Sequence, residues 1–101
     1  MSASTHSPAP WSVAERPCSV EGVSIAWSIF SRERSCIADG QAQEHLGDTG
    51  IHEEECRANA HLMSAAPDML AALQALDQHG HTPMVWEQAK RAMAKAVGGA
   101  A

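Results

Sequence analysis

Apolar residues occupy every second position between residues 23 and 29, and small residues stand between them. The apolar positions are Val23, Ile25, Trp27 and Ile29. A period of two residues places these side chains on one face of an extended chain, as in a strand with one buried face. We therefore expect Trp27 to face the core, whereas an exposed Trp27 would be an anchor for a partner.

Two neighbouring segments can pair with this strand. Residues 34–38 follow a polar turn and can return as a second strand, with Cys36 and Ala38 on one face. Residues 11–14 can add a short strand before Pro17. The pattern predicts a small antiparallel β-hairpin or meander of two or three strands. Because so small a sheet is only marginally stable alone, it should pack on helices.

The second half of the chain carries helical signals. Residues 40–50 contain three glycines among polar residues, which predicts a loop. Residues 53–65 begin with three glutamates, which are favourable at a helix N-terminus. Proline is poor inside a helix but suits its first turn. A second helix is therefore expected to begin at Pro67, and a third at Pro83 with Thr82 as its N-cap.

The last two predicted helices each carry an apolar stripe with helical spacing. The stripes consist of Met69, Leu70, Leu73 and Leu76 in one helix and of Trp86, Ala89, Met93 and Ala96 in the next. Gly80 and residues 98–99 follow the two stripes and are suitable helix ends. The predicted fold class is α+β, with the small antiparallel sheet followed by two to three short α-helices.

With 101 residues the chain has room for one domain. We place this domain at residues 11–97, between a disordered Ser/Ala/Pro-rich tail over 1–10 and a flexible C-terminus over 98–101. The apolar fraction is 45%, but much of it is alanine, and only three Trp and one Phe are present. So modest a core gains stability from a second copy or a partner. The Met69–Leu76 face can be covered by the meander of the same chain or by a second copy.

The formal net charge is −5, from 12 acidic and 7 basic residues. Nucleic-acid binding needs clustered Lys and Arg, so we expect no direct contact with nucleic acid. An acidic protein that occupies the basic groove of another protein suits this charge. Three cysteines form an odd set, unlike a secreted disulfide framework, and no apolar run approaches transmembrane length. We expect a cytoplasmic protein without membrane contact.

The segment 57–73 reads RANAHLMSAAPDMLAAL. It resembles ANAxLIAAAPxLLxAL, a segment found in many small phage and prophage proteins in which a short β region precedes it. Trp86 and the stretch 92–96 resemble the AxxAIAKA-like helix with which those proteins end. The resemblance covers about residues 54–97. It implies an accessory protein of phage or prophage origin in a bacterial host, with no catalytic residues to carry across.

Zinc is a second candidate chemistry, because His45, His52, Cys56 and His61 lie close together in the sequence. Zinc takes three or four nitrogen or sulfur ligands, and two residues four apart share one helix face. No CxxC or HxxxH pair is present. The metal candidates are therefore His52, Cys56 and His61, and a small zinc-binding regulator is the alternative function.

No phosphate loop, GxSxG elbow or HExxH motif occurs, and no set of residues converges as catalysis requires. We expect neither an enzyme nor a bound cofactor. The leading hypothesis is an accessory protein that binds another protein, and its narrower form inhibits a host defence or nucleic-acid-handling protein. A structural homo-oligomer is a further alternative. The interface candidates are Trp27, Trp86, Met69 and Leu73.

Overall fold

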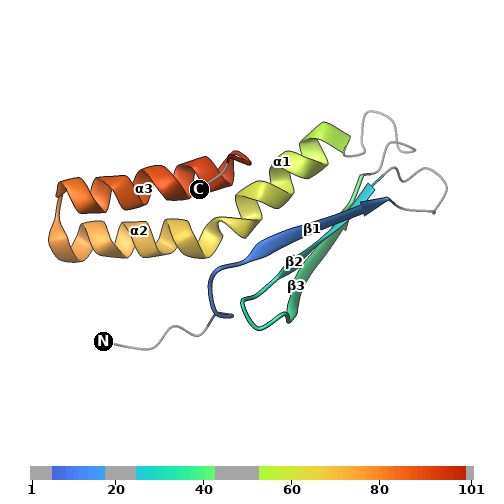
Figure 1. Cartoon of the computed structure of the whole chain (residues 1–101), viewed down its shortest axis with the longest axis horizontal. Coiled ribbons are helices and arrows are strands. Elements are labelled where there is room, and N and C mark those ends of the chain that lie inside the picture. The colour runs from blue at the N-terminus through green and yellow to red at the C-terminus, as the bar shows by residue number, and fades with distance from the viewer. Residues whose placement is uncertain (1–5, 18–24, 43–52, 100–101) are drawn as a thin grey trace.

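The computed structural model describes residues 6–17, 25–42 and 53–99, which form three strands followed by three helices (Figure 1). The strands are β1 (Ser12–Pro17), β2 (Ile25–Phe30) and β3 (Cys36–Gln41), and the helices are α1 (Glu53–Ser64), α2 (Ala66–His79) and α3 (Pro83–Ala96). The predicted α+β fold class is thereby confirmed, and so is the three-stranded form of the meander.

The sheet has the order β1-β2-β3, and both strand pairs are antiparallel. A register shift between Ile29 and Phe30 places Ala38 opposite Ile29 and Cys36 opposite Phe30. This irregularity leaves Ile37 as an extra residue, as in a β-bulge. Both Ile37 and Ala38 then pack against the core, while Cys36 is exposed. The prediction that Cys36 and Ala38 share a face is therefore wrong, because the bulge breaks the two-residue period.

The loop predicted from residue 40 begins later, because β3 continues through Gly40 to Gln41. Gly40 pairs with Trp27 on β2, and a Cβ atom built at Gly40 would collide with the six-membered ring of the indole. The glycine is therefore a packing requirement at this position, since the indole lies over its bare backbone. Residues 43–50 of the predicted loop lie outside the described residues.

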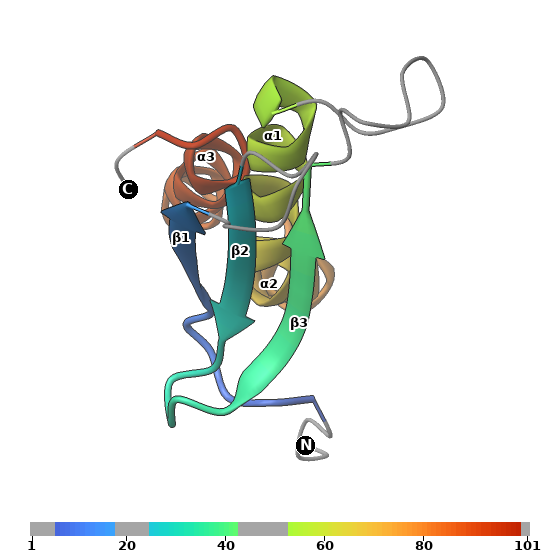
Figure 2. The ribbon, with the colours of Figure 1, turned by 90° about the vertical axis from the view of Figure 1, so that its right-hand side faces the viewer.

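One face of the sheet packs on α1, which lies behind the strands in Figure 2. The core cluster between them consists of Trp27, Ile29, Ala42, Cys56 and Ala60. Trp27 is only 5% exposed, so it is a core residue, as the strand alternation predicted. Its burial also removes it from any surface that a partner could reach.

The helix boundaries follow local signals in the sequence. Pro67 lies in the first turn of α2, which begins one residue before the predicted start. Gly80 ends α2 with a φ of 72°, a left-handed value that costs little for glycine. Thr82 caps α3 as predicted, because its Oγ1 accepts a hydrogen bond from the Val85 amide at 3.2 Å.

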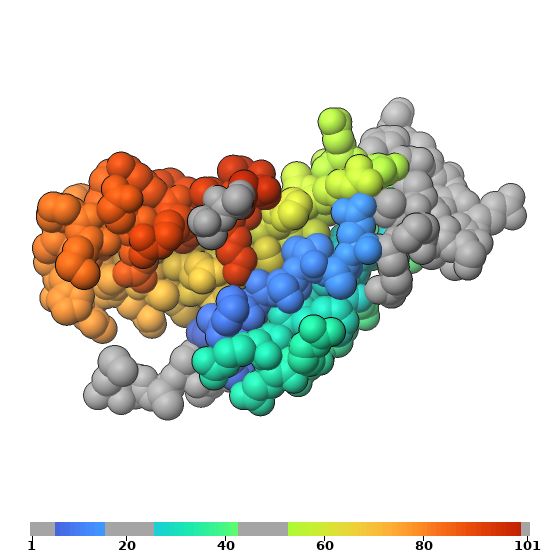
Figure 3. Space-filling model, in the orientation of Figure 1, coloured from blue at the N-terminus to red at the C-terminus, as the bar shows by residue number. Residues whose placement is uncertain are grey.

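Helices α2 and α3 form an antiparallel hairpin joined by residues 80–82 (Figure 1). The hairpin extends beyond the sheet, and the space-filling view shows it on the left, with the strands in the lower middle (Figure 3). The end of α3 returns to α1, and Lys95 forms a 2.8 Å ion pair with Asp68 of α2. Of the helices in the described ranges, none has the length and apolarity needed to span a bilayer.

The described part of the N-terminal segment contacts the turn between β2 and β3. The Arg32 amide donates a hydrogen bond to the Pro8 carbonyl at 3.1 Å, and the Trp11 indole donates to the Ser7 carbonyl at 3.0 Å. These bonds hold residues 7 and 8 beside the end of the sheet that carries the β2–β3 turn, at the bottom of Figure 2.

Candidate functional site

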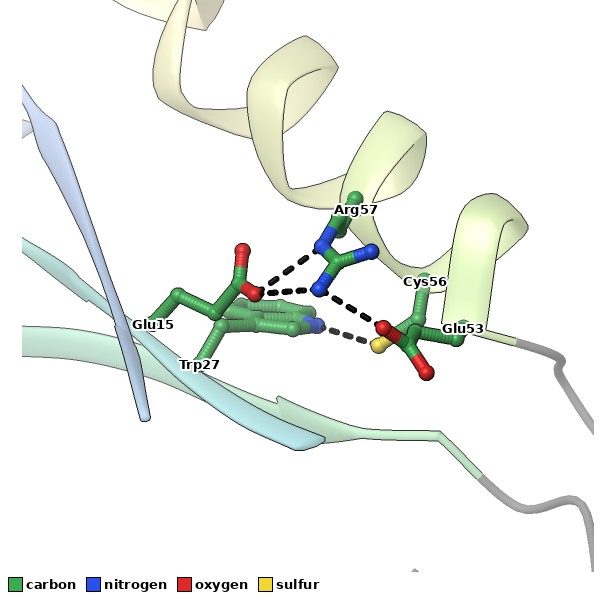
Figure 4. A network of polar contacts seen from close by, with 5 residues as sticks. All are labelled: Glu15, Trp27, Glu53, Cys56 and Arg57. Carbon is green, nitrogen blue, oxygen red and sulfur yellow. Dashed lines mark hydrogen bonds and ion pairs between the residues drawn. The ribbon is translucent and has the colours of Figure 1, made fainter. Parts of the chain in front are cut away.

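A network of polar contacts joins the sheet to the first two turns of α1 (Figure 4). The Trp27 indole N–H donates a hydrogen bond to the Cys56 sulfur at 3.0 Å, and Cys56 is only 2% exposed. Burial raises the pKa of the Cys56 thiol, and this effect is larger than the opposing effect of the indole hydrogen bond. A buried thiol with a raised pKa is a poor nucleophile and a poor metal ligand. Its position indicates a structural role.

Arg57 lies between two carboxylates at the edge of this contact (Figure 4). Its guanidinium is 2.8 Å from Glu15 of β1 and 2.7 Å from Glu53 of α1. The hydrogen bond from Arg57 lowers the pKa of Glu15, and the same bond raises the pKa of Arg57. The pairs are half-exposed at the surface. They connect α1 to β1.

The candidate metal ligands do not converge where the structure describes them. His45 and His52 lie outside the described residues. Cys56 and His61 are five residues apart on α1, so their side chains point about 140° apart around the helix. Cys56 faces Trp27, whereas the His61 ring lies beside Gly98. Across residues 6–17, 25–42 and 53–99, no three His, Cys, Asp or Glu side chains are grouped as metal ligands.

An apolar groove of about 270 Å³ runs along the α2–α3 hairpin. Its described lining consists entirely of apolar residues: Met69, Ala72, Leu73, Leu76, Val85, Trp86, Ala89, Ala92 and Met93. Leu73 is 64% exposed, and Trp86 and Met93 are 52% and 50% exposed. Soluble proteins seldom leave a continuous apolar surface open unless something binds to it.

In the α2–α3 hairpin, small apolar side chains are buried and several large ones are exposed, which is the reverse of an ordinary core. The buried apolar residues at the contact of α2 and α3 are small, namely Ala72, Val85 and Ala92. These small side chains let the two helices approach closely. The large side chains of Leu73, Trp86 and Met93, which would gain most from leaving water, are exposed instead. The hairpin is therefore one layer whose apolar face has no second layer among the described residues.

Three of the four interface candidates come together in this groove. Met69 and Leu73 line it from α2, and Trp86 lines it from α3. Trp27 belongs instead to the core between the sheet and α1. Leu76 and Met93 also line the groove and were not among the four interface candidates, although both belong to the apolar stripes of the sequence. Periodicity alone cannot show which apolar stripe stays uncovered.

The sequence matches a known protein family. A family model described as Salmonella phage P22 protein Y8K6 matches residues 1–100. The chain belongs to this phage protein family. The match supports the phage origin that the segment 57–73 implied, and it extends over the sheet as well as the helices. Neither a curated protein nor a solved structure matches the chain.

Proposed function

We propose that this phage-family protein is a non-catalytic binding protein, and that the apolar groove of the α2–α3 hairpin is its protein-binding surface. The observation that carries the proposal is the inverted burial of the hairpin, in which Leu73, Trp86 and Met93 are exposed while smaller apolar residues are buried at the helix contact. Tryptophan and methionine are enriched where proteins bind one another. A surface of this kind supports recognition by packing and offers no polar group for chemistry.

The distribution of charge bears on the narrower role, the inhibition of a host defence or nucleic-acid-handling protein. Residues 66–101 contain three acidic and three basic residues, so the hairpin region is neutral. Residues 1–65 contain nine acidic and four basic residues and thus carry the whole net charge of −5. An acidic competitor for a basic groove would use the sheet and α1, whose Glu54 and Glu55 are exposed. Replacing both glutamates by lysine would abolish that kind of inhibition and leave the groove intact.

Site-specific photocrosslinking in phage-producing cells tests the binding role. A photoreactive benzoylphenylalanine at Leu73 places the probe in the groove, and the same residue at Ala71 places it on the opposite face of α2. We expect a protein adduct from position 73 that is absent, or at least tenfold weaker, at position 71. Equal adducts at both positions, or none at position 73, would overturn the proposal. The mass of the adduct identifies what covers the groove.

A further inference from the structure

We infer that the groove of the α2–α3 hairpin is covered by the same groove of a second copy of this chain, in a two-fold four-helix arrangement. This inference rests on the proposed binding role of the groove and names its partner. Two antiparallel helices form a single layer, and a stable helical unit buries its apolar face against a second layer. A second hairpin supplies a layer of the same length, with the same apolar stripes.

The chain's own sheet does not cover the groove, because it already covers α1. The inner face of the sheet contributes Trp27 and Ile29 to a core whose helical side is Cys56 and Ala60. Contacts of the sheet with α1 are extensive, whereas the helices of the hairpin pack on each other and on α1. Of the two ways to cover the Met69–Leu76 face, the folding of the meander over it is therefore not the one adopted.

The charge of the hairpin permits a second copy. A chain with a net charge of −5 would repel itself if the excess charge lay at the contact, but the hairpin is neutral. Its ion pairs Lys95–Asp68 and Lys90–Glu87 form within one chain, and the described lining of the groove contains no charged residue. Two grooves can therefore face each other without burying a charge.

The size of the hairpin face fits a dimer of modest affinity. Each helix has 14 residues and is therefore about 21 Å long, and two helices side by side span roughly 20 Å. The faces of two copies then give on the order of 800 Å², and the uneven side-chain surface raises this toward the ~1,000 Å² at the lower limit of biological interfaces. We expect dissociation in the micromolar range.

Sedimentation equilibrium of the purified full chain from 1 to 300 µM tests the inference. We expect a mass that rises with concentration from 10.7 kDa toward twice that value. Leu73→Glu and Trp86→Glu should weaken association at least about tenfold, because each buries a charge at the contact. Gln74→Glu adds the same charge at a neighbouring exposed position outside the groove lining and should leave association unchanged. Circular dichroism of each variant at low concentration checks that the fold is retained.

The outcomes separate this inference from the proposed function. A wild-type chain that stays monomeric at 300 µM, or a dimer that survives Leu73→Glu and Trp86→Glu, overturns the second-copy inference. If the crosslink at position 73 then joins the chain to a different protein, the groove is still a binding surface and only its partner is reassigned. If the crosslink joins two copies and the groove variants are monomeric, both proposals stand.

Discussion

Two tryptophans in this chain have opposite environments, and they characterise the two halves of the molecule. Trp27 is 5% exposed, donates a hydrogen bond to Cys56 and lies over the bare backbone of Gly40. Trp86 is 52% exposed and lines an open apolar groove. The sheet with α1 makes two layers that close on each other, whereas the α2–α3 hairpin is a single layer. A large apolar residue is buried only where a second layer exists to cover it.

The two halves also differ in whether contacts within the chain account for their side chains. In the described part of the sheet half, polar groups beside the core contact one another, as with Cys56 and Trp27 or Arg57 and Glu15. In the hairpin half, no described residue of the chain covers the exposed apolar surface. We therefore assign the proposed binding role to the hairpin, although Cys56 and its neighbouring histidines were the more familiar candidate chemistry in the sequence.

The largest expected effect comes from truncating each of the two tryptophans in turn. Trp27→Ala removes a buried indole and should cost about 3–5 kcal/mol of unfolding free energy, enough to unfold a marginal domain. Trp86→Ala should cost about 1 kcal/mol or less at 1 µM protein, where association contributes least. Urea titrations followed by circular dichroism measure both values. Similar losses for the two variants would contradict the division into a closed and an open half.

A second prediction concerns Gly40, the residue beneath the Trp27 ring. Gly40→Ala forces the indole or β3 to move and should cost about 1–3 kcal/mol, as expected for overpacking. Gly80→Ala is the matched variant in the hairpin, where a Cβ meets no atom within 4 Å but φ is 72°. Its cost should be about 1 kcal/mol and arise from the backbone conformation alone. The near-ultraviolet signal of the tryptophans should change for Gly40→Ala and not for Gly80→Ala.

A third prediction addresses the start of α3. Thr82→Ala removes the hydroxyl that accepts the Val85 amide hydrogen bond and should cost about 1 kcal/mol. Thr82→Ser keeps the hydroxyl and should restore most of that loss. Amide hydrogen exchange should accelerate at Val85 and the residues around it, while the amides of β2 keep their protection. Faster exchange throughout the sheet would show that the two halves unfold as one unit.

The smallest expected effect is the pH dependence of the Glu15–Arg57 pair. The hydrogen bond from Arg57 holds the pKa of Glu15 below its ordinary value of 4.5. The pair therefore stabilises the fold above pH 4.5, and this contribution is lost as the pH falls through the lowered pKa. Exposed ion pairs contribute little, so Glu15→Gln should lower the Tm slightly at pH 7, and this difference should shrink as the pH falls through the lowered pKa of Glu15. In an Arg57→Gln background the same substitution should have no effect at any of these pH values.

Local chemistry explains why the helix ends were predictable. Pro67, Gly80, Thr82 and Pro83 act through their own backbone preferences or through a bond to a residue three positions away, so their neighbours in sequence suffice. The alternation around Trp27 likewise predicted its burial. The loop prediction was wrong at Gly40. Glycine in a sequence favours a loop, and only the folded chain shows that the Trp27 ring requires a glycine within β3.

The amino-acid sequence by itself determined the α+β class, the helix boundaries and the apolar stripes of α2 and α3, since all of these depend on local preference and periodicity. Only the tertiary structure decided which stripe is covered. The bulge beside Cys36, the indole over Gly40 and the sheet packed on α1 rather than on Leu73 depend on contacts between distant segments. Periodicity shows that a face is apolar, but burial requires a second surface, and only the folded chain shows where that surface lies.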